Sequence, residues 1–133
     1  MGRRRQPLFD CRYGATAVEF AIVAPIFLIM IIGIFEISRA LWIKGSMQYA
    51  VEETARYAIV NTSSDMTTLA TYAQSKFSDS GVSAPGITFT AAQDTTGSID
   101  YVTISASYNF QVIVTLVPFP DVTLIAKARI PLK

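Results

Sequence analysis

Few side chains in this sequence could carry out acid–base, nucleophilic or metal chemistry. The chain has no histidine and one cysteine, Cys11. A single chain therefore lacks the residues for a disulfide, a Cys/His zinc site, a Ser–His or Cys–His pair, or histidine-ligated haem. Paired carboxylates that could share acid and base roles do not stand out either. We therefore expect a protein that is not an enzyme and that uses no metal, no cofactor and no small-molecule substrate.

Glu19 is the conspicuous polar residue, because it lies within an apolar stretch. Residues 15–18 and 20–35 contain no charged side chain. A carboxylate inside a membrane segment costs roughly 2.5–3.5 kcal/mol on insertion scales, so such a residue usually has a role. A simpler interpretation stays open: at the start of a helix, Glu19 would lie near the lipid headgroups, where the helix dipole tolerates an acid.

The apolar stretch predicts a helix that crosses a membrane once. About 20 residues of helix rise ~30 Å, which matches the hydrocarbon layer. With one aspartate, the arginines before the stretch give residues 1–14 a net charge of +3. This asymmetry favours a cytoplasmic N-terminus and an extracytoplasmic C-terminal domain. The topology rests on Arg3, Arg4, Arg5 and Arg12.

A cleaved secretory signal is the competing interpretation, because a basic start followed by an apolar run fits it too. Ser38-Arg39-Ala40 resembles its small-x-small cleavage site. However, the apolar run is long for a signal peptide, and Glu36 interrupts the approach to that site. The helical pattern also continues through it, so we favour a retained membrane helix.

Two overlapping segments resemble known proteins. Gly14-Ala-Thr-Ala-Val-Glu-Phe20, between a basic leader and an apolar helix, resembles the processing site of type IV prepilins. The longer segment RYGATAVEFAIVAPIF, residues 12–27, is similar to the opening of TadE-like proteins. Those are minor pilins, or pseudopilins, of the tight-adherence (Tad, or Flp) pilus system. The resemblance implies a role in assembling or priming a Flp-type pilus for surface adhesion.

The resemblance also implies specific site residues. A prepilin peptidase would cut between Gly14 and Ala15, and glycine suits this position because no side chain obstructs entry of the backbone into a protease cleft. Glu19, with Phe20, would be recognised by the peptidase or the assembly platform. Glu19 would alternatively pair with the new α-amine of Ala15 on a neighbouring subunit.

The implied partners are the membrane, the prepilin peptidase, other Flp/Tad pilins and the inner-membrane assembly platform. Nucleic acid is not expected, because the net charge is only +1. Two alternatives remain open at this point. One is a type II secretion pseudopilin, although Ala15 after the cut, where those proteins have phenylalanine, favours the Tad branch. The other is an uncleaved single-pass binding module.

Pro25 lies inside the predicted membrane helix. Transmembrane helices tolerate proline better than soluble ones do, which is one sufficient explanation. Alternatively, Pro25 kinks the helix or lets it melt locally when it is repacked into a fibre. The sequence leaves both interpretations open.

Past Phe35 the pattern becomes amphipathic, which predicts one helix from about Ala15 to Val60. Gly45 makes a bend possible, and Glu52 is spaced for an i,i+4 pair with Arg56. The expected apolar face comprises Ala40, Ile43, Met47, Ala50, Thr54 and Ala58, and the polar face comprises Lys44, Gln48, Glu52 and Arg56.

A second short helix and three strands are predicted after residue 60. Ser64 or Asp65 is expected to cap the helix, which ends at Asp79-Ser-Gly81. Alternating apolar residues predict strands over 87–91, 102–114 and 122–130. The expected turns are Asp94-Thr-Thr-Gly97 and Pro118-Phe119-Pro120, with Phe119 as a candidate contact residue. The aromatic residues Phe89, Tyr101, Tyr108 and Phe110 are expected to pack in the sheet and not to form a ligand cage.

These patterns together predict a pilin-like α+β fold in three parts. Residues 1–14 form a cytoplasmic basic leader that is removed by cleavage, and residues 15–36 form the transmembrane helix. Residues 37–133 form an extracytoplasmic headpiece in which the long helix covers a small antiparallel sheet. The protein is expected in the bacterial cytoplasmic (inner) membrane, either remaining there or entering the pilus.

Overall fold

The computed structural model describes residues 12–113 and 122–132 of the chain. The leader residues Arg3–Arg5 and Cys11, the predicted Pro118-Phe119-Pro120 turn and the side chain of Arg12 lie outside the described residues.

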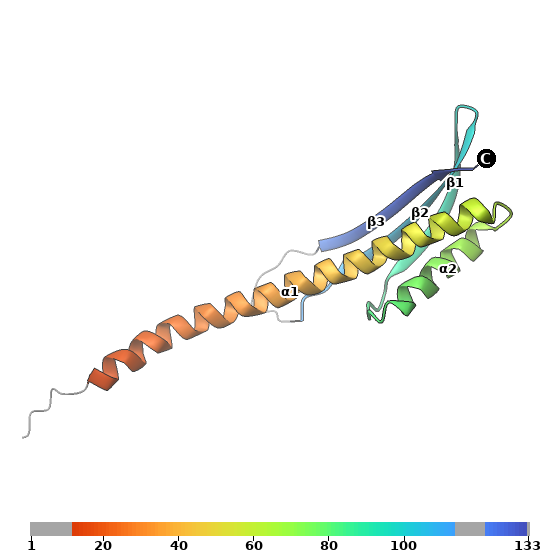
Figure 1. Cartoon of the computed structure of the whole chain (residues 1–133). Helices are drawn as coiled ribbons and strands as arrows, with labels where there is room; N and C mark the ends of the chain where they lie inside the picture. Colours follow the sequence, from red (N-terminus) through yellow and green to blue (C-terminus); the bar gives the residue numbers. More distant parts are fainter. Residues whose placement is uncertain (1–11, 114–121, 133) are drawn as a thin grey trace, which may run out of the picture.

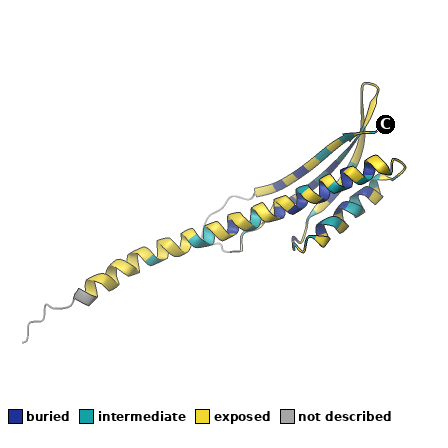
Figure 2. Cartoon of the chain, viewed as in Figure 1, coloured by how far each residue is buried: buried dark blue, intermediate teal, exposed yellow. Residues whose placement is uncertain are grey.

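Helix α1 (Arg12–Val60) is one α-helix of 49 residues, which confirms the predicted continuous helix. It passes through both Pro25 and Gly45. Its N-terminal half projects away from the rest of the molecule, and its C-terminal half lies along the headpiece (Figure 1). At 1.5 Å per residue the helix is ~73 Å long. The projecting half is exposed almost throughout, whereas one side of the C-terminal half is buried (Figure 2).

One predicted side-chain pair on α1 is wrong. Arg56 pairs with Glu53, with Nη1 and Oε2 3.3 Å apart, at i,i+3 spacing. Glu52 instead accepts a hydrogen bond of 2.7 Å from the Gln48 side chain. Both spacings place side chains on adjacent turns, so spacing alone could not decide which acid Arg56 meets.

Helix α2 (Met66–Asp79) is capped by Asp65, the second of the two predicted caps. Its Oδ1 accepts a hydrogen bond of 2.7 Å from the backbone N–H of Thr68, a donor that has no partner within the helix. Leu69, Ala73 and Phe77 form the buried side of α2. Gly81 follows the helix with φ of +71°, a conformation that other residues rarely adopt.

Three strands form one antiparallel sheet in the order β1-β2-β3. They are β1 (Thr88–Thr96), β2 (Ile99–Phe110) and β3 (Val122–Pro131). Every second residue of β2 is buried, as predicted: Val102, Ile104, Ala106, Tyr108 and Phe110.

Two strand ends differ from the prediction. Asp94 to Thr96 belong to β1, where Thr96 pairs with Ile99, so the turn consists of Gly97 and Ser98 alone. Gly97 has φ of +65°, which suits a two-residue hairpin turn. Strand β2 ends at Phe110, before the predicted end at residue 114, because residues 111–113 turn toward α1 and bond to it.

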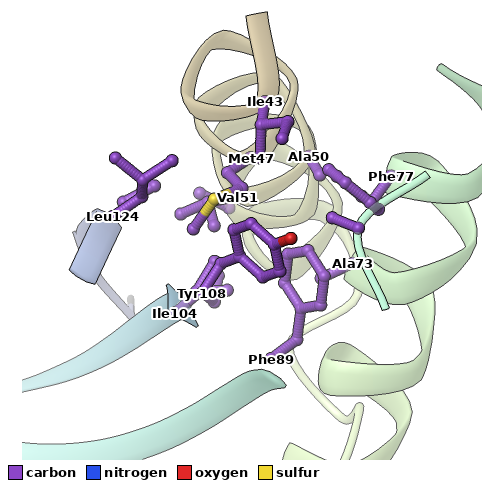
Figure 3. Close-up of a cluster of buried hydrophobic side chains, with 14 of the residues drawn as sticks. Ile43, Met47, Ala50, Val51, Ala73, Phe77, Phe89, Ile104, Tyr108 and Leu124 are labelled. Atoms are coloured by element: carbon purple, nitrogen blue, oxygen red, sulfur yellow. The ribbon is translucent and has the colours of Figure 1, made fainter. Parts of the chain in front are cut away.

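Both helices cover the same face of the sheet. Helix α1 packs on β2 and β3, and α2 packs on β1. Figure 3 shows side chains from all five elements meeting between these layers. The fold is therefore α+β, as predicted. The labelled core residues are Ile43, Met47, Ala50 and Val51 of α1, Ala73 and Phe77 of α2, and Phe89, Ile104, Tyr108 and Leu124 of the strands.

The aromatic residues of the sheet pack as predicted. Phe89, Tyr108 and Phe110 are buried. Tyr101 is half-buried, and the guanidinium of Arg129 lies 4.1 Å from its ring centroid.

Candidate functional site

The predicted processing segment lies in the first turns of α1. Gly14, Ala15, Glu19 and Phe20 are all exposed there. The Gly14–Ala15 peptide bond is helical, because α1 begins at Arg12. A protease that requires extended substrate must therefore unwind this end first. Gly14 and Ala15 lie in the first turn of α1, whose N–H groups have no partners within the helix. Space at Gly14 is open, since a Cβ built on it meets no atom within 4 Å.

Ala15 and Glu19 share one side of α1, because residues four apart in a helix lie above one another. The α-amine that cleavage would leave on Ala15 is a backbone group at the start of the helix, about one turn from the residue that carries the Glu19 carboxylate. This spacing would let a single partner contact both groups. It does not by itself decide between the peptidase and a neighbouring subunit.

The segment that follows Glu19 has an apolar surface on all sides. Of the described residues, one helix, α1, is long and apolar enough to cross a membrane, and its candidate membrane-spanning part is counted from Gly14. Almost none of its most apolar stretch is buried by the rest of the chain. Monomeric soluble proteins rarely expose a continuous apolar surface of this size. The helix could thus span a membrane, and Pro25 lies within it without interrupting α1.

A second polar site occurs where the projecting half of α1 meets the headpiece, and sequence reasoning missed it. Glu36 is only 6% exposed. Its Oε2 lies 2.8 Å from Nη2 of Arg39, and its Oε1 accepts a hydrogen bond of 2.9 Å from the backbone N–H of Ile113. Arg39 also donates to the carbonyl oxygen of Gln111 and lies 4.2 Å from the ring centroid of Phe110. We call these five residues the junction cluster.

The junction cluster joins the end of β2 to α1. An acid at the end of an apolar run followed by an arginine three positions later indicates a helical ion pair. That signal was available in the sequence. The contacts with residues 110–113 could not be predicted from the sequence. The Gln111 carbonyl and the Ile113 N–H become available to bond α1 only because β2 ends at Phe110.

No group of three or more His, Cys, Asp or Glu side chains that could hold a metal ion occurs within the parts of the chain that are described. The exposed carboxylate of Glu19 and the buried carboxylate of Glu36 occupy different stretches of α1. The first is exposed, and the second bonds α1 to the residues that follow β2.

Comparison with known proteins gives one family. Residues 14–56 match the family described as TadE-like protein. The match begins at the predicted cleavage glycine, includes Glu19, and ends within the C-terminal half of α1, before α2. Neither the curated proteins nor the solved structures contain a match. The resemblance predicted from the sequence is thereby confirmed: over residues 14–56 the chain is similar to TadE-like proteins of the Tad pilus system.

Proposed function

We propose that this chain is a minor prepilin of a Flp/Tad type IV pilus, cut by a prepilin peptidase between Gly14 and Ala15. In this proposal it acts in assembly or priming of the pilus and thereby in surface adhesion. The observation that carries it is the start of the TadE-like match at Gly14, with Glu19 on the exposed first turns of a long apolar helix. The protein is held in the inner membrane with its N-terminus in the cytoplasm.

We propose a structural role for the chain, and not catalysis. One unbroken helix connects the apolar segment to the headpiece core, so a load on either part passes directly to the other. The junction cluster and the Ile43–Ala58 side of α1 fix the sheet to that helix. The headpiece also favours a minor component, because major Flp pilins are very short.

Glu19 has a defined task in this proposal. Cleavage creates a charged amine on Ala15, and the carboxylate of a neighbouring subunit can pair with it inside a growing fibre. Leaving one partner of such a buried pair without the other costs on the order of 3–5 kcal/mol. The pair would therefore set the axial register of the subunits.

Processing is tested first by intact mass and N-terminal sequencing of the membrane-extracted protein, with and without a functional prepilin peptidase. Loss of residues 1–14 only in the presence of the peptidase supports the proposal. A full-length chain in both strains overturns cleavage at Gly14 and favours the uncleaved single-pass module.

Assembly is tested with Glu19→Ala, which should remain in the membrane but abolish piliation. Glu52→Ala is the matched control, because it removes an exposed acid from the headpiece part of the same helix. Normal piliation in Glu19→Ala would contradict the proposed pairing. Loss of protein secretion with intact pili would instead support a type II secretion pseudopilin.

A further inference from the structure

The exposed apolar surface of α1 continues beyond Glu36, where the predicted membrane segment ends. Ile37 is 53% exposed, Leu41 64% and Trp42 69%. Within the described part of α1, the first exposed charged side chain after Glu19 is Lys44, since Glu36 is buried and Arg39 is half-buried. The surface therefore stays apolar for nearly two more turns.

This surface is wide. At 100° per residue, Ile37 and Trp42 lie about 140° apart around the helix, with Leu41 between them. Ser38 lies in the same arc, and its hydroxyl donates a hydrogen bond of 2.8 Å to the carbonyl oxygen of Ile34. A coiled-coil partner needs only a narrow apolar seam along a helix. This arc is broader, and its one hydroxyl, on Ser38, is hydrogen-bonded within the helix, so the arc suits contact with a continuous apolar medium such as lipid.

Polar groups of the neighbouring junction cluster bond to one another inside the protein. The Glu36 carboxylate bonds to Arg39 and to the N–H of Ile113, and Arg39 bonds to the carbonyl of Gln111. Non-helical backbone is tolerated at membrane depth only when its polar groups have such partners. The side chain of Ile113, at the same level as Glu36, is itself 74% exposed.

From these observations we infer that the outer interfacial layer of the bilayer reaches Trp42, so that Ile37, Leu41, Trp42 and Ile113 contact lipid. This inference rests on the membrane anchoring in the proposed function. Glu19 and Trp42 are separated by ~35 Å along the helix axis. That length exceeds the ~30 Å hydrocarbon core and falls within the ~40–45 Å that includes the headgroups.

The chemistry of the outer end of this segment fits this placement. Tryptophan concentrates at membrane–water interfaces because its ring is apolar and its N–H is polar. Lys44, two residues further along, can direct its ammonium to the headgroups. The junction cluster then lies at the membrane surface, and the headpiece sits directly on the bilayer.

The test uses the fluorescence of Trp42, the single tryptophan of the chain. The full chain is placed in phosphatidylcholine vesicles that contain lipids brominated at either a shallow or a deep acyl position. We expect blue-shifted emission that shallow bromines quench more strongly than deep ones. Red-shifted emission that responds to aqueous acrylamide but not to bromolipids overturns the inference.

Two variants show whether a negative result contradicts the membrane anchoring or only the position of Trp42. In a Trp42→Phe background, Phe27→Trp should be quenched best by deep bromines, because Phe27 lies midway along the apolar segment. Tyr49→Trp in the same background lies seven residues beyond Trp42 on the same side and should escape bromolipid quenching. If the Phe27→Trp signal is unquenched, the membrane anchoring itself fails. If it is quenched but Trp42 is not, only the inference fails.

Contact with a second copy of the chain is the other outcome to separate. In that case the emission of Trp42 would be blue-shifted but insensitive to bromolipid, and it would shift to the red when the protein is diluted in lipid. Such a result would show that another helix covers this surface. That result overturns the assignment to lipid.

Discussion

The Oε1 atom of Glu36 accepts a hydrogen bond of 2.9 Å from the backbone N–H of Ile113, 77 positions later in the chain. The other carboxylate oxygen of Glu36 pairs with Arg39. A single buried carboxylate thus connects the long helix to the end of β2. It lies where α1 changes from a helix exposed on nearly all sides to one that is covered on one side by the sheet.

Glu36→Ala should loosen the end of β2 without unfolding the headpiece. Removing the carboxylate leaves the Ile113 N–H and the Arg39 guanidinium without this partner, which costs about 1–2 kcal/mol for a partly buried group. The expected effect on amide hydrogen exchange is about 5- to 30-fold faster exchange at Ile113 and neighbouring residues of β2.

Glu36→Gln is the matched control for this prediction. Its amide oxygen can still accept from Ile113, while the ion pair with Arg39 is lost. Exchange at Ile113 should therefore rise less than in Glu36→Ala. Unchanged exchange in Glu36→Ala would show that the junction cluster does not hold this part of the sheet.

Asp65 should make the stability of the headpiece depend on pH in the acidic range. Its side-chain and backbone hydrogen bonds with Thr68 lower the pKa of the Asp65 carboxyl below its ordinary value of 3.8. Since the folded-state pKa is the lower one, the ionised cap stabilises α2 above pH 3.8, and this contribution is lost as the pH falls through the folded-state pKa. Thermal unfolding of Asp65→Ala should show a lower Tm at neutral pH, by a few degrees.

Asp65→Asn isolates the titration from the cap itself. Asparagine is also a good N-cap residue but does not ionise. Its Tm at neutral pH should stay near that of the natural chain, and the acid-dependent part of the stability due to residue 65 should disappear. A drop in Tm equal to that of Asp65→Ala would contradict the assignment of Asp65 as the cap.

Local patterns predicted most of this fold, because the elements are long and strongly periodic. The three- and four-residue steps from Ile43 to Ala58 identified the buried side of α1. The alternation from Val102 to Phe110 identified the buried face of β2. Both patterns repeat over several turns or residue pairs, so single exceptions could not change the interpretation.

The parts that sequence missed depend on contacts between distant residues. Alternation continued through Val112, but the backbone left the sheet because Glu36 and Arg39 bind residues 111–113. The Asp94–Gly97 turn was predicted too early, because Asp94 to Thr96 pair with Ile99 to Tyr101 of β2. Arg129 on β3 also contacts Asp94, with Nη2 and Oδ2 2.6 Å apart. In the candidate site, Glu19 stands out in the sequence as an acid within an apolar stretch, and Gly14 is named only through the family resemblance. The contacts of Glu36 with residue 113 could not be predicted from the sequence.

Gly14→Val should block processing without disturbing the fold. A Cβ at Gly14 meets no atom within 4 Å, so the folded protein has room for a side chain there. In the proposed cleavage, the added branched side chain obstructs entry of the backbone into the protease cleft. The expected result is a full-length chain in the membrane, observed by intact mass in a strain with a functional peptidase, and an unchanged Tm of the headpiece.

Gly45→Ala is the matched control, because Gly45 also lies in α1 and a Cβ there likewise meets no atom within 4 Å. Processing of this variant should be normal. If Gly14→Val is cut as efficiently as Gly45→Ala, with the new N-terminus still at Ala15, the peptidase does not read the glycine. Recognition would then have to rest on Glu19 and the apolar helix that follows it.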